Sequence, residues 1–265
     1  MQRRAFLKMM GASAIAGLAF SPWVERLATL AAPGHLVYQG ADLANWEVAL
    51  GDGLYSAPGQ MPVRRDDIAT VHKGAYSELR ANLQQRGIMA HNITFNRKCD
   101  PLALTYTHLC EYEFRLPFAP ITNNWMTNGQ TLEASFGIWD GGETRLNYMT
   151  ALQWILNPWL NNFGAIRCWS GANGGSWITV GHLPPDTHWH KLTLVFDYQR
   201  QATTIGIDGQ PYLSSFVSIP KPLYWGTETA ARFAAEIISL YPDTKSTGPL
   251  HLAEFRNWRW IWIPN

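Results

Sequence analysis

The strand pattern of this chain is clearest in the stretch HWHKLTLVFD, residues 188–197. Leu192, Leu194 and Phe196 alternate there with other residues, so in an extended chain the three lie on one face. A short run rich in β-branched residues follows and ends in Asp208-Gly209, a dipeptide typical of tight hairpin turns. These features predict antiparallel β-strands with one buried face.

Alternation of period two recurs along most of the chain, and a helical period of 3.6 is rare. Clusters of Gly, Pro, Asn and Asp separate the alternating runs, as turns require. No repeat of fixed period emerges, which disfavours propellers and solenoids. The pattern predicts an all-β protein, although the alanines of residues 227–241 could start a short helix before any strand. The candidate strands are residues 36–39, 77–83, 88–95, 102–108, 110–116, 131–139, 146–156, 163–169, 176–180, 189–197, 203–207, 212–217, 233–241 and 250–262.

A family resemblance rests on residues 188–197, on the strand that ends in Asp208-Gly209, and on the closing segment LAEFRNWRW, residues 252–260. These segments resemble the paired strands and the closing strand of the concanavalin A-like jelly rolls, the superfamily of lectins, laminin-G domains and glucanases. At the level of strand order the resemblance covers residues 100 to 262. It implies an antiparallel β-sandwich, and residues 33–265 are long enough for a single domain of this type.

The first 32 residues resemble a twin-arginine export signal. Arg3-Arg4 is followed by Phe6-Leu7-Lys8, then by the apolar residues 9–20, and small residues near Ala31 offer a cleavage region. The uncharged segment is shorter than the roughly 20 apolar residues that a membrane span needs. The resemblance implies that residues 1–32 are a signal peptide read by the twin-arginine translocase. The mature protein is then expected to be periplasmic or secreted.

Charge and motifs narrow the classes of partner. The whole chain carries a formal net charge of +1, without a long run of like charge. Binding to nucleic acid requires a clustered positive face, so nucleic acid is not expected as a partner. The sequence contains no Gly-x-Ser-x-Gly elbow, no phosphate-binding loop and no dinucleotide fingerprint, and no cofactor is expected.

The three cysteines leave two interpretations open. In an oxidising compartment Cys99 and Cys110 could form a disulfide and leave Cys168 as the odd thiol. Alternatively all three are reduced and buried, as free cysteines often are.

Metal binding has two weak candidates. His188 and His190 would share one side of a strand, but two ligands do not make a metal site. The loop at residues 140–143 carries two acidic residues that could bind calcium, or it could simply be a turn. The identity of any metal therefore stays open.

Aromatic enrichment points to carbohydrate. The chain contains 13 tryptophans, and the apolar faces of sugar rings stack on indole. Many of these tryptophans will fill the core of a large sandwich. We expect Trp139, Trp169 and Trp177, which lie in glycine-rich or turn contexts, to bind carbohydrate together with the amides of Asn147 and Gln153.

Acidic residues suggest a second kind of site. Glu111 and Glu113 share one face of a candidate strand, and Glu133 lies on the next candidate strand. If those strands are neighbours, the three acids would line one surface, as glycoside hydrolysis requires. Glucanases of the resembled superfamily carry Glu-x-Asp-x-Glu or Glu-x-Asp-x-x-Glu on one strand. Here Glu111-Tyr112-Glu113 keeps only the first spacing, because Arg115 and Leu116 stand where the third acid would be.

The tryptophans of the last candidate strand could be exposed or covered. Strict alternation would place Trp258, Trp260 and Trp262 on one face together with Glu254 and Arg256. Such a strip could be partly exposed, or the N-terminal segment could seal it.

We therefore expect an exported β-sandwich protein that binds or processes an extracellular or cell-envelope polysaccharide. One alternative is a non-catalytic structural or interaction protein of the envelope. Another is a glycoside hydrolase that uses a glutamate pair formed among Glu111, Glu113 and Glu133. A polysaccharide lyase, which needs a base near the sugar C5 proton, could use histidine and tyrosine side chains such as His91, His108, Tyr106 and Tyr148.

Overall fold

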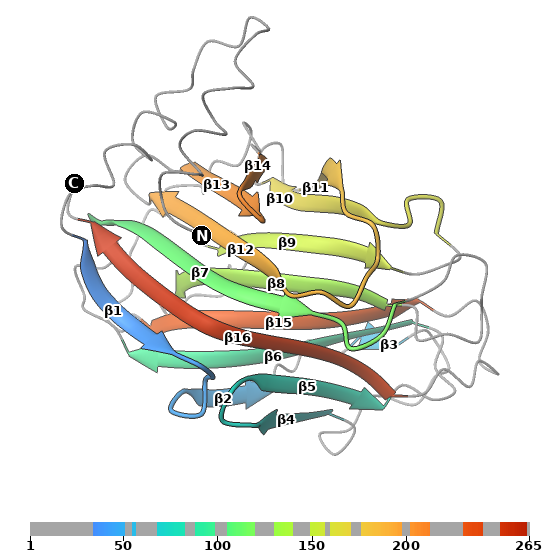
Figure 1. Cartoon of the computed structure of the whole chain (residues 1–265), viewed down its shortest axis with the longest axis horizontal. Helices are drawn as coiled ribbons and strands as arrows, with labels where there is room; N and C mark the ends of the chain where they lie inside the picture. The colour runs from blue at the N-terminus through green and yellow to red at the C-terminus, as the bar shows by residue number, and fades with distance from the viewer. Residues whose placement is uncertain are drawn as a thin grey trace, which may run out of the picture.

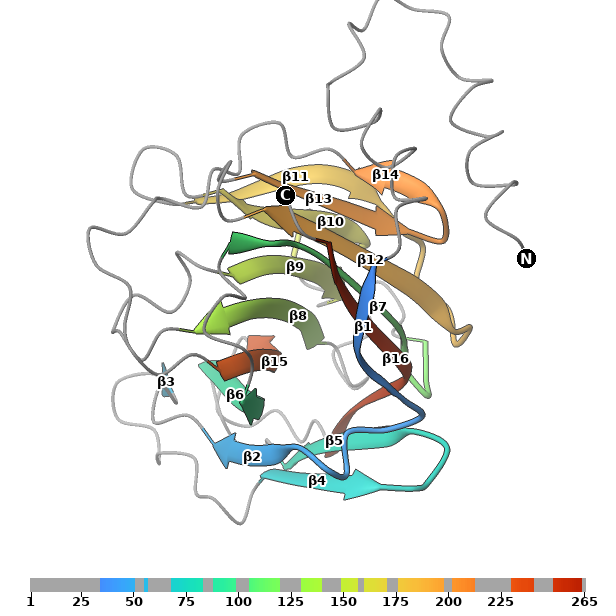
Figure 2. The same ribbon diagram turned by 90° about the vertical axis from the view of Figure 1, so that its left-hand side faces the viewer.

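The computed structural model describes residues 34–50, 55–56, 68–82, 88–98, 105–119, 130–139, 149–156, 160–170, 176–197, 202–212, 230–240 and 250–263. The regular elements in these ranges are all β-strands. They form two antiparallel sheets that face each other (Figure 1, Figure 2). The predicted all-β sandwich is therefore confirmed. No helix in these ranges is long and apolar enough to cross a membrane, and the predicted signal at residues 1–32 lies outside them.

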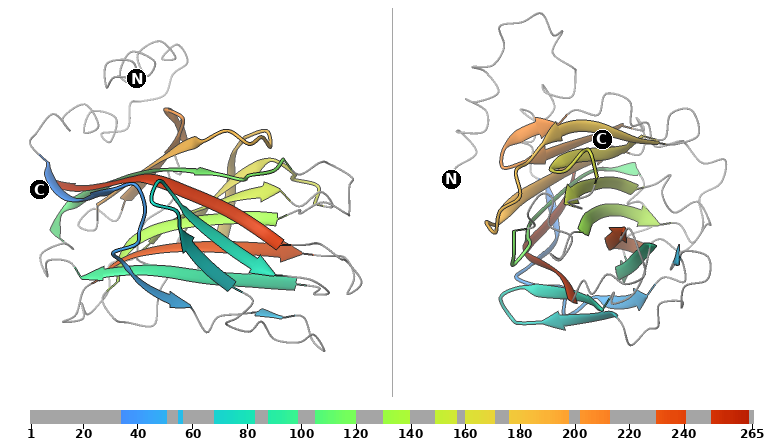
Figure 3. Two further views of the ribbon diagram at one scale, coloured as in Figure 1. Left: turned by 60° about the horizontal axis from the view of Figure 1, so that its bottom comes forward. Right: turned by 90° about the vertical axis from the view of Figure 1, so that its right-hand side faces the viewer.

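Sheet A contains eight strands within the described residues. Strand β1 lies along the C-terminal half of β16 (Figure 3), so the N-terminal and C-terminal segments pair with each other. The strands follow the order β14 (Gln210–Tyr212), β13 (Ala202–Ile207), β12 (His190–Asp197), β7 (Thr107–Arg115), β16 (Leu250–Ile263), β5 (Ser77–Asn82) and β4 (Ile68–His72), and β1 (His35–Gly40) pairs with β16.

Sheet B also has eight strands in the described part of the chain. Its long central strand β15 pairs with β6 on one side and with β8 on the other. The strands follow the order β11 (Ser176–His182), β10 (Ala165–Ser170), β9 (Met149–Leu156), β8 (Gln130–Trp139), β15 (Ala230–Leu240), β6 (Ile88–Lys98) and β2 (Glu47–Leu50), and β3 (Tyr55–Ser56) pairs with β6.

The inner faces of the two sheets meet in a hydrophobic core. Cys110, Tyr112 and Phe114 alternate along β7 and are fully buried, as period two demands of one strand face. Phe114 of sheet A meets Trp154 of sheet B with ring centroids 5.9 Å apart. Each fully buried large apolar side chain contributes about 1.5–3 kcal/mol to the free energy of folding, relative to the same side chain left exposed. The core therefore joins the two layers directly.

Most of the predicted strands are present. The turn at Asp208-Gly209 is confirmed, because both residues have positive φ, 50° and 81°, between β13 and β14. Residues 230–240 form a strand rather than a helix, since pairing on both sides overrides the helix propensity of alanine. The short strands β2, β3 and β4 were not predicted from the sequence. The predicted strand at residues 102–108 includes Thr105 and Tyr106, whereas β7 begins at Thr107.

A β-bulge divides the last strand. Asn257 has a φ of 56°, a left-handed conformation that asparagine tolerates, and the pairing of β16 with β7 shifts between Arg256 and Arg259. The extra residue reverses the alternation, so Trp258 and Trp260 face the core. The prediction that these tryptophans share a face with Arg256 is therefore wrong.

The described cysteines are buried free thiols. Cys110 and Cys168 are free and buried on the inner faces of the two sheets. Of the two interpretations left open, the disulfide between Cys99 and Cys110 is excluded because Cys110 is a free thiol, while Cys99 itself lies outside the described residues. Burial raises the pKa of the Cys168 thiol to about 12, so it stays protonated and unreactive at neutral pH.

Candidate functional site

A row of polar side chains crosses the outer face of sheet B. Leu132 and Trp154 point into the core, so their neighbours Glu133 on β8 and Gln153 on β9 lie on the opposite face. Glu133 and Gln153 are register partners, and Gln153 Nε2 donates a hydrogen bond to Glu133 Oε2 over 2.8 Å. Both side chains are buried. An amide therefore holds the carboxylate in place beneath the outer surface.

Arg167 on β10 continues the row. It is the register partner of Gln153 and of Thr179 on β11. Burial decreases along the row, because Gln153 is buried, Arg167 is partly exposed and Thr179 is exposed. Solvent therefore reaches this face most easily at β10 and β11.

Two tryptophans lie next to Arg167 at that accessible end. Trp169 and Trp177 are register partners, and their rings make an edge-to-face contact with centroids 5.5 Å apart and an interplanar angle of 70°. Both are partly exposed. Arg167 Nη2 donates to the backbone oxygen of Trp177 over 3.2 Å. The hairpin of β10 and β11 thus presents two indoles and a guanidinium side by side.

Four of the residues predicted for carbohydrate binding or catalysis thus share one face of sheet B, namely Glu133, Gln153, Trp169 and Trp177. Trp139 ends β8 in the same alternation phase as Glu133, and Asn147 lies outside the described residues. The sequence analysis missed Arg167, although it lies two residues before Trp169 on the same strand. It also missed Glu236 of β15, the register partner of Glu133, because that segment was open to a helical interpretation.

Glu111 and Glu113 lie elsewhere, on the outer face of sheet A. Glu111 Oε1 is 2.8 Å from Lys191 Nζ, and Glu111 Oε2 is 3.3 Å from Arg259 Nη1. Glu113 Oε2 is 2.7 Å from Arg256 Nε. Each carboxylate is thus engaged by at least one cation, an arrangement that fits cross-strand stabilisation better than catalysis.

The expectation that Glu111 and Glu113 share one surface with Glu133 is wrong. Strands β7 and β8 follow each other in the sequence, but β7 belongs to sheet A and β8 to sheet B. The two outer faces point away from each other, and packed sheets are already about 10 Å apart. Paired catalytic carboxyls need a separation of about 5–9.5 Å, so neither Glu111 nor Glu113 can work with Glu133.

Of the side chains named for a lyase, the two that the structure describes, His108 and Tyr106, do not lie on the polar face of sheet B. His108 is buried in the core, where its Nδ1 accepts a hydrogen bond of 3.0 Å from Trp260 Nε1. Tyr106 contacts Trp262 of β16. His91 lies on β6, but its side chain and all of Tyr148 are outside the described part.

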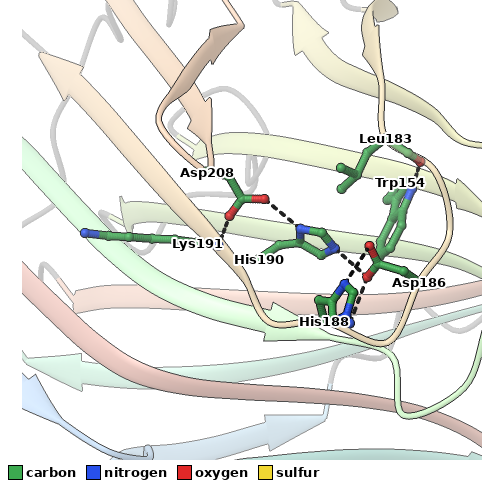
Figure 4. Close-up of polar contacts among 7 residues, drawn as sticks. All are labelled: Trp154, Leu183, Asp186, His188, His190, Lys191 and Asp208. Atoms are coloured by element: carbon green, nitrogen blue, oxygen red, sulfur yellow. Dashed lines mark hydrogen bonds and ion pairs between the residues drawn. The ribbon is translucent and has the colours of Figure 1, made fainter. Parts of the chain in front are cut away.

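A second polar cluster surrounds His190 at the start of β12 (Figure 4). His190 Nδ1 lies 2.7 Å from Asp208 Oδ2, and His190 Nε2 lies 2.9 Å from Asp186 Oδ1. The buried ring also packs against Trp154 and Phe114. Both ring nitrogens can donate to carboxylates only in the imidazolium form, so this geometry favours a charged histidine.

Backbone donors complete the cluster. The N–H groups of His188 and Lys191 each donate over 2.8 Å, to Asp186 Oδ1 and Asp208 Oδ1 respectively. Burial opposes the charged form of His190, but the hydrogen bonds and charges of Asp208 and Asp186 outweigh it and raise its pKa. Burial also raises the aspartate pKa values, yet the same hydrogen bonds outweigh that effect and lower both.

The histidine pair does not share a strand face as expected, because His188 precedes β12 with an exposed side chain while His190 is buried. In the described ranges no three His, Cys, Asp or Glu side chains are grouped so as to hold a metal ion. The loop at residues 140–143, for which calcium binding and a simple turn were both left open, lies outside those ranges. We therefore interpret the cluster as a clasp that ties the start of β12 to the β13–β14 turn.

His190→Gln should lower the stability at pH 5 by about 1–2 kcal/mol, since it removes two charge-assisted hydrogen bonds to partly exposed carboxylates. The pKa of His190 is raised in the folded state, so its contribution is complete below the unfolded value of 6.5 and is lost as the pH rises through the folded pKa. The pKa values of Asp186 and Asp208 are lowered in the folded state, so their contributions to stability are present above pH 3.8, the unfolded pKa. These contributions are lost as the pH falls through the folded pKa values. Urea unfolding from pH 4 to 9 should show the largest difference from wild type between these limits. His188→Gln is the control, because the His188 side chain contacts Asp186 over 3.3 Å but is exposed, so solvent screens that contact. An equal effect of both variants would contradict the clasp.

The fold and this face together define a jelly-roll β-sandwich with an aromatic and polar patch on one sheet. No protein-family model matches the sequence, and no curated protein is similar to it in sequence. Among solved structures, the CBM2 module of the evolved Dit of Lactobacillus casei BL23 phage J-1 is similar over 88% of this chain and 97% of its own, with 11% identity and a TM-score of 0.51.

Two further similar structures carry the names of enzymes. The alginate lyase AlyC3 aligns over 83% of this chain and 90% of its own, with 12% identity and a TM-score of 0.44. A sialidase aligns over 78% of this chain, with 12% identity and a TM-score of 0.45, and this chain spans only 16% of the sialidase's length. At these identities the likeness concerns the fold alone. The chain is an antiparallel β-sandwich of the jelly-roll type.

Proposed function

We propose that this protein binds a polysaccharide on the outer face of sheet B, around Trp169 and Trp177. The observation that carries the proposal is the partly exposed edge-to-face indole pair beside Arg167. Indole rings offer apolar surface to the C–H face of a sugar, and nearby donors orient its hydroxyl groups. The buried Gln153–Glu133 pair lies on the same face, beside Arg167 in the cross-strand row. The proposal rests on these contacts and not on the likeness in fold.

The place of action is a separate proposal. Residues 1–32 carry the features of a twin-arginine signal, and a mature protein outside the cytoplasm would meet extracellular or cell-envelope polysaccharide. Fractionation of cells that express the full chain tests it, since the mature form should appear in the periplasm or the medium. Replacing Arg3 and Arg4 by lysine should keep the protein in the cytoplasm.

Trp177→Ala should weaken polysaccharide binding by about thirtyfold, equivalent to about 2 kcal/mol, because central aromatic contacts dominate such interfaces. Affinity electrophoresis through gels that contain a panel of soluble polysaccharides measures the loss, and pull-down on insoluble glycans extends the panel. Trp189→Ala is the matched control, since Trp189 directly precedes β12 of the other sheet and its ring contacts the guanidinium groups of Arg115 and Arg256. Equal binding by Trp177→Ala and wild type would place the site elsewhere.

A hydrolase remains the second candidate, for one specific reason. Glu133 and Glu236 are register partners on adjacent strands, and opposed residues of antiparallel strands have Cβ atoms about 4.5–5.5 Å apart. Retaining glycosidases need two carboxyls about 5–5.5 Å apart. Release of reducing ends from any bound polysaccharide, abolished by Glu133→Gln, would establish this activity. Retention without release favours a binding protein.

A further inference from the structure

Arg167 carries a charge that the described residues do not neutralise. Its guanidinium donates to the backbone oxygen of Trp177, an uncharged acceptor. Burial lowers the pKa of Arg167, and among the described groups no charge contributes to the shift. A guanidinium has five N–H donors in a rigid planar fork, so one bond to a carbonyl leaves most of them available. Keeping such a cation partly desolvated without a counter-ion costs free energy.

The arginines on the outer face of sheet A behave differently. Each of four such arginines has a glutamate partner, in the pairs Arg80–Glu78, Arg115–Glu254, Arg256–Glu113 and Arg259–Glu111. The four arginines on sheet A are neutralised by glutamates, whereas Arg167 has no acidic partner among the described residues. This difference distinguishes the accessible end of sheet B. An anion from outside the chain would supply the missing partner.

A second unmet donor lies on the same strand face. Trp169 Nε1 is buried and makes no hydrogen bond within the described part of the chain. Trp169 follows Arg167 by two residues, so both side chains project from the same side of β10. A buried N–H without an acceptor is unfavourable, and a ligand oxygen would supply the missing acceptor. The patch therefore combines a cation, a neutral donor and the indole surface of Trp177.

We infer that Arg167 binds the carboxylate of an acidic sugar residue that packs beside Trp169 and Trp177, so that the ligand is a uronate-containing polysaccharide. The inference rests on the proposed function, because it names the class of polysaccharide for the same face. A neutral sugar would use the indoles and the Trp169 N–H but would leave the guanidinium without a counter-ion. The planar fork of arginine matches the two oxygens of a carboxylate, and such charge-assisted bonds are about twice as strong as neutral ones.

The test compares polymers that differ only in charge. Alginate, polygalacturonate and hyaluronate are each cast into native gels beside their carboxyl-reduced forms, in which every carboxylate has become a primary alcohol. The full-length protein, Arg167→Met and Arg167→Lys are run together with Arg259→Met, a charge-matched control on sheet A. Circular dichroism and thermal unfolding verify that each variant is folded.

We expect wild type to bind at least one uronate polymer about tenfold or more tightly than its reduced form. Arg167→Met should lose that preference, Arg167→Lys should keep part of it, and Arg259→Met should match wild type. The inference would be overturned if wild type bound each uronate polymer and its carboxyl-reduced form equally well. It would also be overturned if Arg167→Met kept the preference for the uronate polymer. Polysaccharide binding at this face would still stand in that case if Trp177→Ala weakened it as expected. Binding to a sulfated neutral polymer but to no uronate polymer would also refute the carboxylate, and binding to no polysaccharide would defeat the proposed function.

Discussion

Replacing Trp260 by alanine is expected to reduce the free energy of unfolding by about 3–5 kcal/mol. Trp260 is fully buried on β16, the strand that pairs with β7, β5 and β1 and so holds sheet A together. Its indole Nε1 donates to His108 Nδ1 over 3.0 Å, and the two rings stack with centroids 5.8 Å apart. Truncation opens a cavity and also removes a buried donor from His108. Denaturation by urea, followed by circular dichroism, measures the loss.

Trp260→Phe separates the two contributions. Phenylalanine keeps most of the ring volume but cannot donate to His108, so its cost should be about 1–3 kcal/mol, the penalty of an acceptor that loses its donor. If Trp260→Ala cost less than 1 kcal/mol, the arrangement of β16 described above would be wrong.

The strand that carries Trp260 shows how far sequence reasoning reaches. Alternation along residues 250–262 predicted the strand itself, because period two is a local property of the chain. The bulge at Asn257 depends on the pairing with β7, and no local pattern marks which asparagine will adopt positive φ. A shift of one residue exchanges the faces, so one missed bulge moved Trp258 and Trp260 from the face of Glu254 and Arg256 into the core.

In the candidate site, too, local features were predicted correctly and features that depend on strand pairing were not. Turn context selected Trp169 and Trp177, and the two prove to be register partners on adjacent strands. The acids Glu111 and Glu113 were misplaced because sequential strands were assumed to pair, whereas the connection between β7 and β8 crosses from one sheet to the other. Which sheet a strand joins is decided by long-range pairing. Alternation gives the face of a residue relative to its strand neighbours but not the strand that lies beside it.

The two outer faces have different physical characters as a consequence. On sheet A, cross-strand ion pairs neutralise Glu111 and Glu113, and Trp189 is covered by two guanidinium groups. On sheet B, Arg167 keeps unused donors and Trp169 keeps a buried N–H without a described partner. Satisfied polar groups stabilise a surface, while unsatisfied ones favour a ligand that completes them.

Trp154→Ala should also cost about 3–5 kcal/mol, because this side chain connects three parts of the molecule. It is fully buried on β9, its ring meets Phe114 and His190 of sheet A, and its Nε1 donates to the backbone oxygen of Leu183 over 2.9 Å. Removing it opens a cavity between the sheets and leaves that carbonyl without its donor. Urea unfolding at pH 7 measures the change.

Trp154 also allows stability and binding to be separated on a single strand. Its neighbour Gln153 lies on the opposite face of β9, bonded to Glu133 and beside the proposed polysaccharide site. Trp154→Phe should lose about 1–3 kcal/mol of stability through the Leu183 hydrogen bond. Its affinity for polysaccharide, measured well below the unfolding midpoint, should nevertheless match wild type, since no atom of the outer face has changed. A large loss of affinity in folded Trp154→Phe would mean that the ligand depends on the core side of β9, and the outer face of sheet B would no longer account for binding.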